Sequence, residues 1–332
     1  MVSIKDIARE CGVSAAAVSK ALNDRDDIAE ATKKRIRKVA SEMGYAANPS
    51  ARALKTNKTY NIGILFDDAM SSGIGHEYFS LILESFRAES EKLGYDITFI
   101  NHNIAGQPTT FLKHCEYRSF DGVAVINADF TSKEITELAE SDIPVVTLDY
   151  VYDVCSSVVS DNSKGMRKIV DYVCSMGHKK IAIIHGEMTA VTQERMSGFY
   201  WACRENKISV PGEYVREGRY HDMEMSAVKT AEFLNLKDRP TCIIYPDDYS
   251  YLGATEIFKE YGLSVPEDIS VVGYDGINMA RVMRLTTYSQ NTEDMGRKAA
   301  ELLINRIENS DSEIEHLEIS GTLLYGKTVR KI

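Results

Sequence analysis

The sequence VSAAAVSKALN, at residues 13–23, lies at the centre of a helix–turn–helix pattern in the first 58 residues. Before it, Ser3 can cap a short helix over residues 4–10, and Gly12 suits the left-handed backbone conformation of a tight turn. Ser14 can cap the second helix. Helical spacing then predicts that this second helix turns three apolar side chains inward, namely Val18, Ala21 and Leu22.

The outer face of the second helix is predicted to carry mostly small side chains. Ala15, Ala16, Ser19 and Lys20 face outward at this spacing, and such a face can approach another molecule closely. The DNA major groove is wide enough to admit a helix of this kind. A third helix is predicted over about 29–43, with an outer basic face of Lys33, Lys34, Arg35, Arg37 and Lys38. The alternative is a generic three-helix bundle with a solvated basic face.

Two longer stretches carry a family resemblance: IKDIARECGVSAAAVSKALN at residues 4–23 and RIRKVASEMGYAANPSARALKTNKTYNIGIL at residues 35–65. In order and spacing they resemble the start of a lactose/galactose-repressor (LacI/GalR) family transcription regulator. The resemblance extends more loosely over the whole chain. It implies a helix-turn-helix DNA-binding headpiece at 1–47, a hinge helix and linker at 48–59, and an effector-binding and dimerisation core at 60–332.

For the headpiece we expect base contacts from Ala15, Ala16 and Lys20, because a lysine can donate to guanine and alanine methyls can pack on thymine methyls. We expect phosphate contacts from Ser14, Ser19 and Asn23. In the hinge, Asn48 can cap a short helix that starts at Pro49. The predicted hinge contacts to DNA come from Asn48, Ala51 and Leu54, and the resemblance implies that Leu54 wedges into the minor groove. The alternative is that Leu54 packs on the core.

Charge is distributed unevenly along the chain. The whole sequence has a formal net charge of −10, but residues 1–58 contain 12 Lys/Arg and 7 Asp/Glu. A basic head on an acidic body is typical of a nucleic-acid-binding module joined to a core that does not bind nucleic acid.

Six scattered cysteines without a Cys-x-x-Cys pair predict reduced thiols. We expect no signal peptide and no membrane span, and therefore a cytoplasmic protein.

From Tyr60 onward the sequence alternates between strand and helix patterns, in two successive series of similar length. This predicts an α/β core of two doubly wound parallel-sheet lobes, and the resemblance implies the periplasmic-binding-protein-like fold with three crossings between lobes, near residues 160, 290 and 322. The N-lobe is then about 60–160 and 291–321, and the C-lobe about 161–290 and 322–332. A single final strand is predicted within 315–324.

Polar side chains follow several predicted strands, where ligands of parallel sheets bind. Carboxylates, an arginine fork and aromatic faces suit a ligand with vicinal hydroxyls. The alternative for Asp248 is that it caps the helix that follows it. The resemblance favours ligand contact for Arg195 and Asp275, and it places an aromatic of the Glu77-Tyr78-Phe79 segment in the pocket. The predicted effector-binding residues are Phe79, Asp149, Arg195, Tyr220, Asp248 and Asp275.

The sequence contains no motif of an enzyme. No P-loop, no nucleophile elbow, no complete dinucleotide fingerprint and no His/Cys cluster occurs. We therefore expect neither catalysis nor a cofactor or resident metal.

The predicted function is that of a repressor, which acts as a homodimer on a palindromic operator and is controlled by a small molecule, with a sugar or glycoside favoured. The alternatives are a purine- or phosphoprotein-responsive co-regulator, or a small-molecule-binding protein that does not act on DNA.

Overall fold

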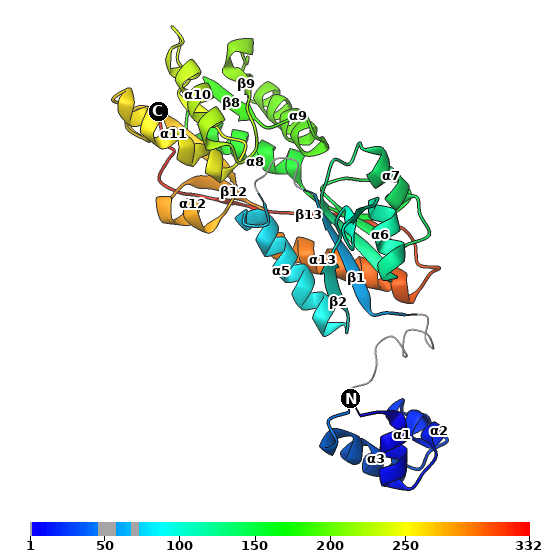
Figure 1. The fold of residues 1–332 in the computed structure, drawn as a ribbon. Coiled ribbons are helices and arrows are strands. Elements are labelled where there is room, and N and C mark those ends of the chain that lie inside the picture. Colours follow the sequence, from blue (N-terminus) through cyan, green and yellow to red (C-terminus); the bar gives the residue numbers. More distant parts are fainter. Residues whose placement is uncertain (1, 46–57, 68–72) are drawn as a thin grey trace. The chain divides into compact units, whose positions relative to one another are not determined.

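The computed structural model describes residues 2–45, 58–67 and 73–332. They belong to two compact units, Met1–Thr59 and Tyr60–Ile332 (Figure 1). Within those ranges no helix combines the length and the apolar character that crossing a lipid bilayer requires.

The first unit consists of three short helices around a small apolar core. Ser3 and Asp6 form a capping box, because the Ser3 hydroxyl accepts from the Asp6 N–H while the Asp6 carboxylate accepts from the Ser3 N–H. Gly12 ends the first helix at φ 63°, and the Ser14 hydroxyl caps the second, so these predicted caps are confirmed. The helices are α1 (Ile4–Cys11), α2 (Ala15–Leu22) and α3 (Glu30–Glu42).

One lysine of the predicted basic face is buried. Lys33 is only 6% exposed, and its Nζ lies 3.0 Å from Asp24 Oδ1 and 3.6 Å from Glu30 Oε2. The aliphatic stem of a lysine can cover apolar surface while the ammonium group reaches a carboxylate at the edge. The prediction that Lys33 lies on the outer face is therefore wrong, whereas Lys34, Arg35, Arg37 and Lys38 are exposed as predicted.

The N-lobe is a six-stranded sheet in the order β13-β7-β6-β5-β1-β2, with all pairs parallel. Helices α5 and α13 cover one face, and α6 and α7 cover the other. The strands are β1 (Asn61–Phe66), β2 (Asp96–Phe99), β5 (Gly122–Asn127), β6 (Val145–Leu148), β7 (Ser156–Ser160) and β13 (His316–Ile319), with a small hairpin of β3 (Asn103–Ile104) and β4 (Gln107–Pro108). The helices are α5 (Glu77–Lys92), α6 (Phe111–Arg118), α7 (Lys133–Ala139) and α13 (Thr292–Glu308).

The C-lobe repeats this plan with the order β14-β12-β11-β10-β8-β9, in which only the β12–β14 pair is antiparallel. Helices α8 and α9 cover one face, and α10 and α11 the other. The strands are β8 (Ile181–His185), β9 (Val215–Glu217), β10 (Cys242–Ile244), β11 (Ser270–Asp275), β12 (Thr286–Ser289) and β14 (Thr322–Leu324). The helices are α8 (Asn162–Ser175), α9 (Ala190–Glu205), α10 (Met223–Leu234), α11 (Asp248–Glu260), α12 (Asn278–Met283) and the 3-10 helix η1 (Gly212–Tyr214).

The chain passes between the two sheets three times, from β7 to α8, from β12 to α13, and from β13 to β14. The last crossing corrects the prediction of one final strand within 315–324. Two short strands occupy that stretch, one in each sheet, because Ser320 and Gly321 carry the chain across the gap. Strand β12 and helix α12 were not predicted. The doubly wound, two-lobed α/β fold class is confirmed.

Candidate functional site

The exposed face of α2 carries the small side chains that the sequence placed there. Ala15, Ala16 and Lys20 are exposed, and Ser19 is half-buried. The Lys20 ammonium group forms an ion pair with Asp27. A base contact by Lys20 would therefore first require this surface ion pair to open, at small cost because exposed pairs contribute little stability.

The two predicted phosphate-contact residues at the ends of α2 also serve the helix itself. The Ser14 hydroxyl accepts from the Ala17 N–H at 3.1 Å, and the Asn23 amide donates to the Ser19 carbonyl at 2.6 Å. Both side chains remain exposed. The hinge residues Asn48, Ala51 and Leu54 lie outside the described residues.

A cavity of about 390 Å³ lies between the lobes of the second unit, at the carboxyl ends of the strands. It contains five of the six predicted effector residues, contributed by separate loops and helices of both lobes. From the N-lobe come Phe79 and Asp149, and from the C-lobe come Arg195, Tyr220 and Asp275. The structure thus brings together residues that are as much as 196 positions apart in the sequence.

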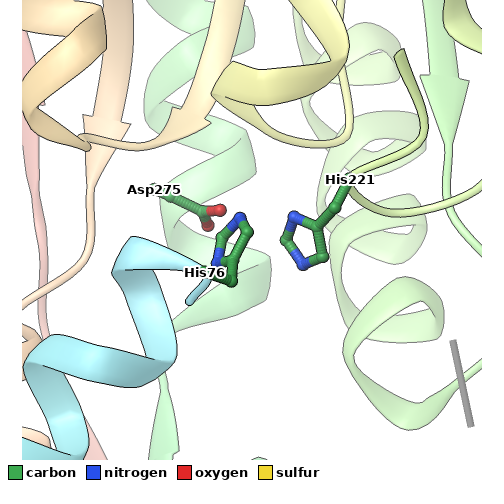
Figure 2. A group of neighbouring side chains, drawn as sticks. All are labelled: His76, His221 and Asp275. Carbon is green, nitrogen blue, oxygen red and sulfur yellow. The ribbon is translucent and has the colours of Figure 1, made fainter. Parts of the chain in front are cut away.

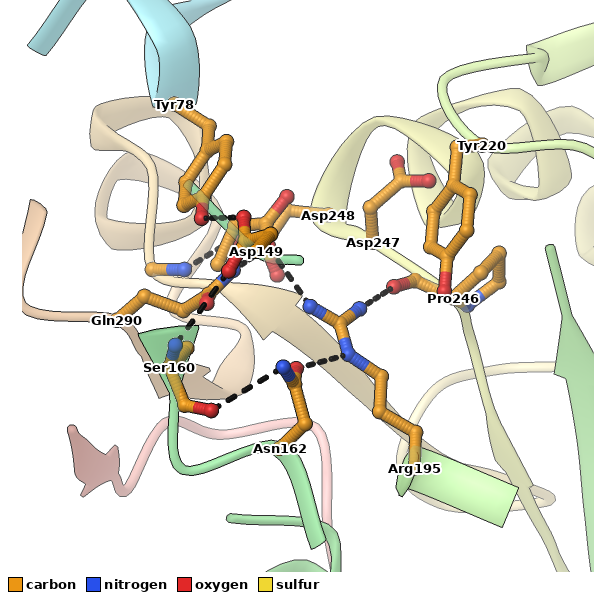
Figure 3. Close-up of polar contacts among 12 residues, drawn as sticks. Tyr78, Asp149, Ser160, Asn162, Arg195, Tyr220, Pro246, Asp247, Asp248 and Gln290 are labelled. Atoms are coloured by element: carbon orange, nitrogen blue, oxygen red, sulfur yellow. Dashed lines mark hydrogen bonds and ion pairs between the residues drawn. The ribbon is translucent and has the colours of Figure 1, made fainter. Parts of the chain in front are cut away.

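Arg195 is the best-anchored side chain of the cavity. It is 6% exposed, its Nε donates to Asn162 Oδ1 at 2.8 Å, and its Nη1 donates to the Pro246 carbonyl at 2.9 Å (Figure 3). The guanidinium carbon stands 3.6 Å from the centre of the Tyr274 ring, a cation–π contact. Its Nη2 faces Asp275 Oδ1, at 3.9 Å. Two hydrogen bonds and one ring contact thus fix the direction in which Arg195 offers its remaining N–H donors.

Two carboxylates flank that donor, one from each lobe. Asp149 Oδ2 accepts from the Tyr78 hydroxyl at 2.7 Å, and Asp275 Oδ1 accepts from the Gln290 amide at 2.6 Å. Burial raises the pKa of both carboxyls above the usual range, and for Asp275 to about 6, although Arg195 opposes the rise. Asp149 Oδ1 also accepts from the Ser160 N–H, at 3.4 Å. Each carboxylate oxygen can accept more than one hydrogen bond, so both groups can still bind donors of a ligand.

Asp248, a predicted effector-binding residue, does not line the cavity, and the alternative that it caps the helix is wrong. Asp247 is the cap of α11, since its Oδ1 accepts from the Ser250 N–H at 2.8 Å. The Asp248 carboxylate lies behind the cavity wall and accepts from the N–H groups of Gly276 and Ile277. It thereby holds the turn after Asp275, and burial raises its own pKa well above the usual value.

Several cavity residues were not predicted. Phe130 and Tyr150 form a stacked pair with ring centres 4.9 Å apart, in loops that follow β5 and β6. The rule that ligands bind beyond strand ends could have identified both. Gln290 follows β12, a strand that was itself missed, so no sequence signal marked it. Tyr78 and His221 are neighbours of the predicted Phe79 and Tyr220.

Comparisons with known proteins agree with this architecture. Residues 3–48 match the family of bacterial regulatory proteins, lacI family, and residues 170–329 match a periplasmic binding protein-like domain. The chain is 30% identical to the HTH-type transcriptional repressor PurR of Vibrio vulnificus (strain CMCP6), with 100% of both chains covered. The operator- and ONPF-bound lac repressor dimer superposes with a TM-score of 0.81, at 22% identity over 99% of both chains. A complex of the transcriptional regulator CelR with cellobiose superposes with a TM-score of 0.72, at 22% identity, over 99% of this chain and 100% of that chain.

The matched relatives are transcriptional repressors rather than enzymes, so the prediction that this chain is not an enzyme is confirmed. The headpiece match, the two-lobed core and the full-length identity to a repressor lead to one conclusion. The chain belongs to the lacI family of bacterial regulatory proteins and is a DNA-binding transcriptional regulator.

Proposed function

We propose that this regulator is a cytoplasmic, homodimeric repressor whose affinity for a palindromic operator is controlled by a neutral sugar or glycoside in the interlobe cavity. The observation that carries the effector class is the arrangement of Asp149, Asp275 and the Nη2 group of Arg195 around one space. Hydroxyl groups both donate and accept hydrogen bonds, so a sugar needs both carboxylate acceptors and a directed donor in its site. The rings of Phe79 and Tyr220 supply apolar faces against which a sugar ring can pack.

The charge of the cavity supports a neutral ligand over an anionic one. Its lining contains five carboxylate side chains and one arginine. A phosphate group would be repelled by several of these carboxylates, in a setting where water screens them poorly. The five are Asp67, Asp129, Asp149, Glu187 and Asp275. The solved CelR complex of the same fold contains cellobiose, which is compatible with this effector class.

A purine is the second candidate, because the matched full-length relatives are repressors named PurR. The stacked Phe130 and Tyr150 also offer a flat aromatic surface in the cavity. A base would use its ring N–H groups as donors to the same carboxylates. The two candidates therefore differ in the ligand and share the site.

For the operator we propose that α2 enters the major groove. Ala15, Ala16 and Lys20 then meet base edges, while Ser14, Ser19 and Asn23 reach phosphates. Asn48, Ala51 and Leu54 act at the centre of the operator, with Leu54 in the minor groove. Two copies related by a twofold axis read the two half-sites.

The proposed mechanism is a shift between two populations of the core. An effector that bridges the lobes favours the arrangement in which Asp149 and Asp275 approach each other, and so changes the spacing of the two headpieces. Coupling of this kind is reciprocal, so operator and effector must change each other's affinity by the same factor. Equal effector Kd values with and without operator DNA would refute the mechanism.

The effector class is tested by a thermal-shift screen of the full chain against sugars, glycosides, sugar phosphates and purines, in the presence of a chelator. A ligand that binds only the native state raises Tm by mass action. We expect hits among neutral sugars or glycosides. Hits restricted to purines would replace the first candidate by the second, and hits restricted to sugar phosphates would contradict the charge argument.

Asp275→Ala tests the site itself. The variant should lose its Tm response to the effector and the effector's influence on operator affinity, because it removes an acceptor and the neighbour of Arg195. Operator binding without effector should persist. Leu93→Ala, an exposed position on the N-lobe, serves as the control. If Asp275→Ala still responded to the effector, the Asp275 carboxylate would not be an effector-binding group.

A further inference from the structure

Two histidines and an aspartate from both lobes meet at one end of the interlobe cavity (Figure 2). His76 immediately precedes α5 of the N-lobe, His221 lies in the C-lobe loop between β9 and α10, and Asp275 ends β11 of the C-lobe. One donor atom from each residue can be chosen so that all three lie within 4.8 Å of one another. The two imidazole rings have centres 3.5 Å apart.

The donor set is that of a transition metal site. Two imidazole nitrogens and one carboxylate oxygen bind zinc and related divalent ions, and leave one or more positions for other ligands. Calcium and magnesium prefer sites made of oxygen, so they fit these residues poorly. His76 is 5% exposed and Asp275 is 7% exposed, so the donors are already withdrawn from bulk water.

Neighbouring groups hold the C-lobe donors in place. The backbone N–H of His221 donates to Asp247 Oδ2 at 2.8 Å, and Asp247 Oδ1 lies 3.7 Å from the ring nitrogen Nδ1 of His221. A carboxylate beside a ligating imidazole fixes the orientation of the ring and raises its basicity toward a metal. The Gln290 amide fixes one oxygen of Asp275. Asp275 itself has φ 103°, a strained conformation for a residue with a side chain, and such strain is typical of functional positions.

We propose that His76, His221 and Asp275 bind one divalent transition metal ion of the zinc class, which fastens the N-lobe to the C-lobe. His221 and Asp275 also line the cavity, so the metal site adjoins the effector space. The lobes already meet nearby, where the Asn278 N–H of α12 donates to Glu77 Oε1 of α5 at 2.8 Å.

The ion selects one arrangement of the core, because separation of the lobes removes His76 from the other two donors. It thus acts as a second effector that is coupled to the operator through the same lobe motion. This regulatory part rests on the proposed function, whereas binding of the ion does not.

Binding is measured by titrating the full-length protein with Co²⁺, whose visible absorption reports nitrogen and oxygen ligands, and then displacing it with Zn²⁺. We expect one ion per chain. His76→Ala and His221→Ala should each weaken binding by more than about tenfold, since even the residues behind metal ligands have effects of that size. His102→Ala, which removes an exposed histidine of the N-lobe, is the matched control and should bind as the wild type does.

Folding of the variants is checked separately by their Tm in a chelator, and by whether Zn²⁺ raises it. Zn²⁺ should raise the Tm of the wild type and of the control but not of the two variants. The site would be overturned if the wild type did not bind one Co²⁺ per chain, or if both histidine variants bound Co²⁺ as tightly as the wild type does. A charge-transfer absorption of the kind that cysteine ligands give would also overturn it. Wild-type binding of Zn²⁺ that leaves operator affinity unchanged would overturn its regulatory part.

The outcome is independent of the effector screen, because metal binding is measured without effector or DNA and the screen is run in a chelator. A failed sugar screen with intact Co²⁺ binding refutes the effector class alone. A positive sugar screen without Co²⁺ binding refutes the metal site alone.

Discussion

At the scale of single residues, the charged side chains of the headpiece serve different ends. Lys33 is buried against Asp24 and Glu30, while Lys20 on the adjacent helix is exposed and paired with Asp27. The first lysine supports the fold of the three helices. The second remains available to a partner because its ion pair lies at the surface.

Lys20→Ala should weaken operator binding and relax base preference at one position of each half-site. The loss expected for a base contact is about 1–3 kcal/mol of discrimination against the wrong base. The measurement is binding to the operator and to single-base variants of it at fixed salt concentration. Lys34→Ala, on the exposed face of α3, is the comparison. A uniform loss over all sequences would make Lys20 a phosphate contact instead.

His178 shows how one residue can make stability depend on pH. It is buried, with Nδ1 2.9 Å from Thr241 Oγ1 and Nε2 3.1 Å from the Arg330 carbonyl. Burial lowers its pKa below the ordinary value of 6.5. Below pH 6.5 this histidine therefore takes up a proton more readily in the unfolded chain than in the folded chain. The contribution of neutral His178 to the free energy of unfolding is complete above pH 6.5 and declines as the pH falls.

The free energy of unfolding should accordingly decrease on acidification, and His178→Gln should reduce this dependence. Urea unfolding of the wild type and of His178→Gln, each at about pH 7.5 and about pH 5.5, measures how far the free energy of unfolding falls with pH in each protein. His102→Gln, at an exposed position, should retain the wild-type dependence. The same loss of stability in wild type and His178→Gln would assign the effect to other groups.

At the scale of elements, α13 is the helix that completes the N-lobe from the far end of the sequence. It lies against α5 (Figure 1), and the two helices approach closely at Gly296. A Cβ at this position would lie 2.3 Å from the Ile82 carbonyl oxygen and 2.8 Å from the Phe86 nitrogen. Backbone atoms of a helix cannot yield as a flexible side chain can, so the contact requires glycine.

Gly296→Ala should therefore destabilise the chain by about 1–3 kcal/mol through overpacking, despite the better helix propensity of alanine. Chemical denaturation of the two proteins measures the difference. Gly212→Ala is the matched control, because a Cβ at Gly212 meets nothing within 4 Å. An unchanged or raised stability of Gly296→Ala would show that α5 and α13 can separate at no cost.

At the scale of the whole molecule, one phenol joins the three segments that cross between the lobes. The Tyr288 hydroxyl donates to Asp161 Oδ1 at 2.6 Å and accepts from the Gly321 N–H at 2.9 Å. Asp161 lies at the first crossing, the β7–α8 junction, and Tyr288 lies in β12, just before the second crossing. Gly321 lies at the third crossing, the β13–β14 junction. The three crossings between the lobes thus form one hydrogen-bonded junction rather than three independent linkers.

Tyr288→Phe should loosen this junction, because it leaves a buried carboxylate without its phenol donor. A loss of about 1–3 kcal/mol in the free energy of unfolding is expected. Effector and operator affinities should also become less strongly coupled, which paired titrations with and without operator would detect. Tyr117→Phe, at an exposed tyrosine, should leave both quantities unchanged. If Tyr288→Phe kept the wild-type stability and the wild-type coupling between effector and operator binding, other contacts would hold this junction together.

Local sequence determined the helices, their caps and the strand–helix alternation, because each depends on residues within a few positions of one another. Ser3, Gly12 and Ser14 delimit α1 and α2 as their chemistry predicts. That strand–helix alternation predicted the two parallel-sheet lobes, and the resemblance favoured Arg195 and Asp275 among the polar residues that follow strands. Tertiary structure alone decided which neighbouring aspartate caps and which supports a turn, since Asp247 and Asp248 have the same chemistry and differ only in surroundings.

The same limit applies to larger groups of residues. Lys33 can be buried because Asp24 comes within reach of its ammonium group. Residues 315–324 divide between two sheets because each half pairs with a different strand. His76, His221 and Asp275 are separated by 145 and 54 positions, so no local spacing could indicate that their side chains meet. Periodicity reports which face of an element is apolar, whereas contacts between elements depend on how the lobes pack, which only the three-dimensional structure contains.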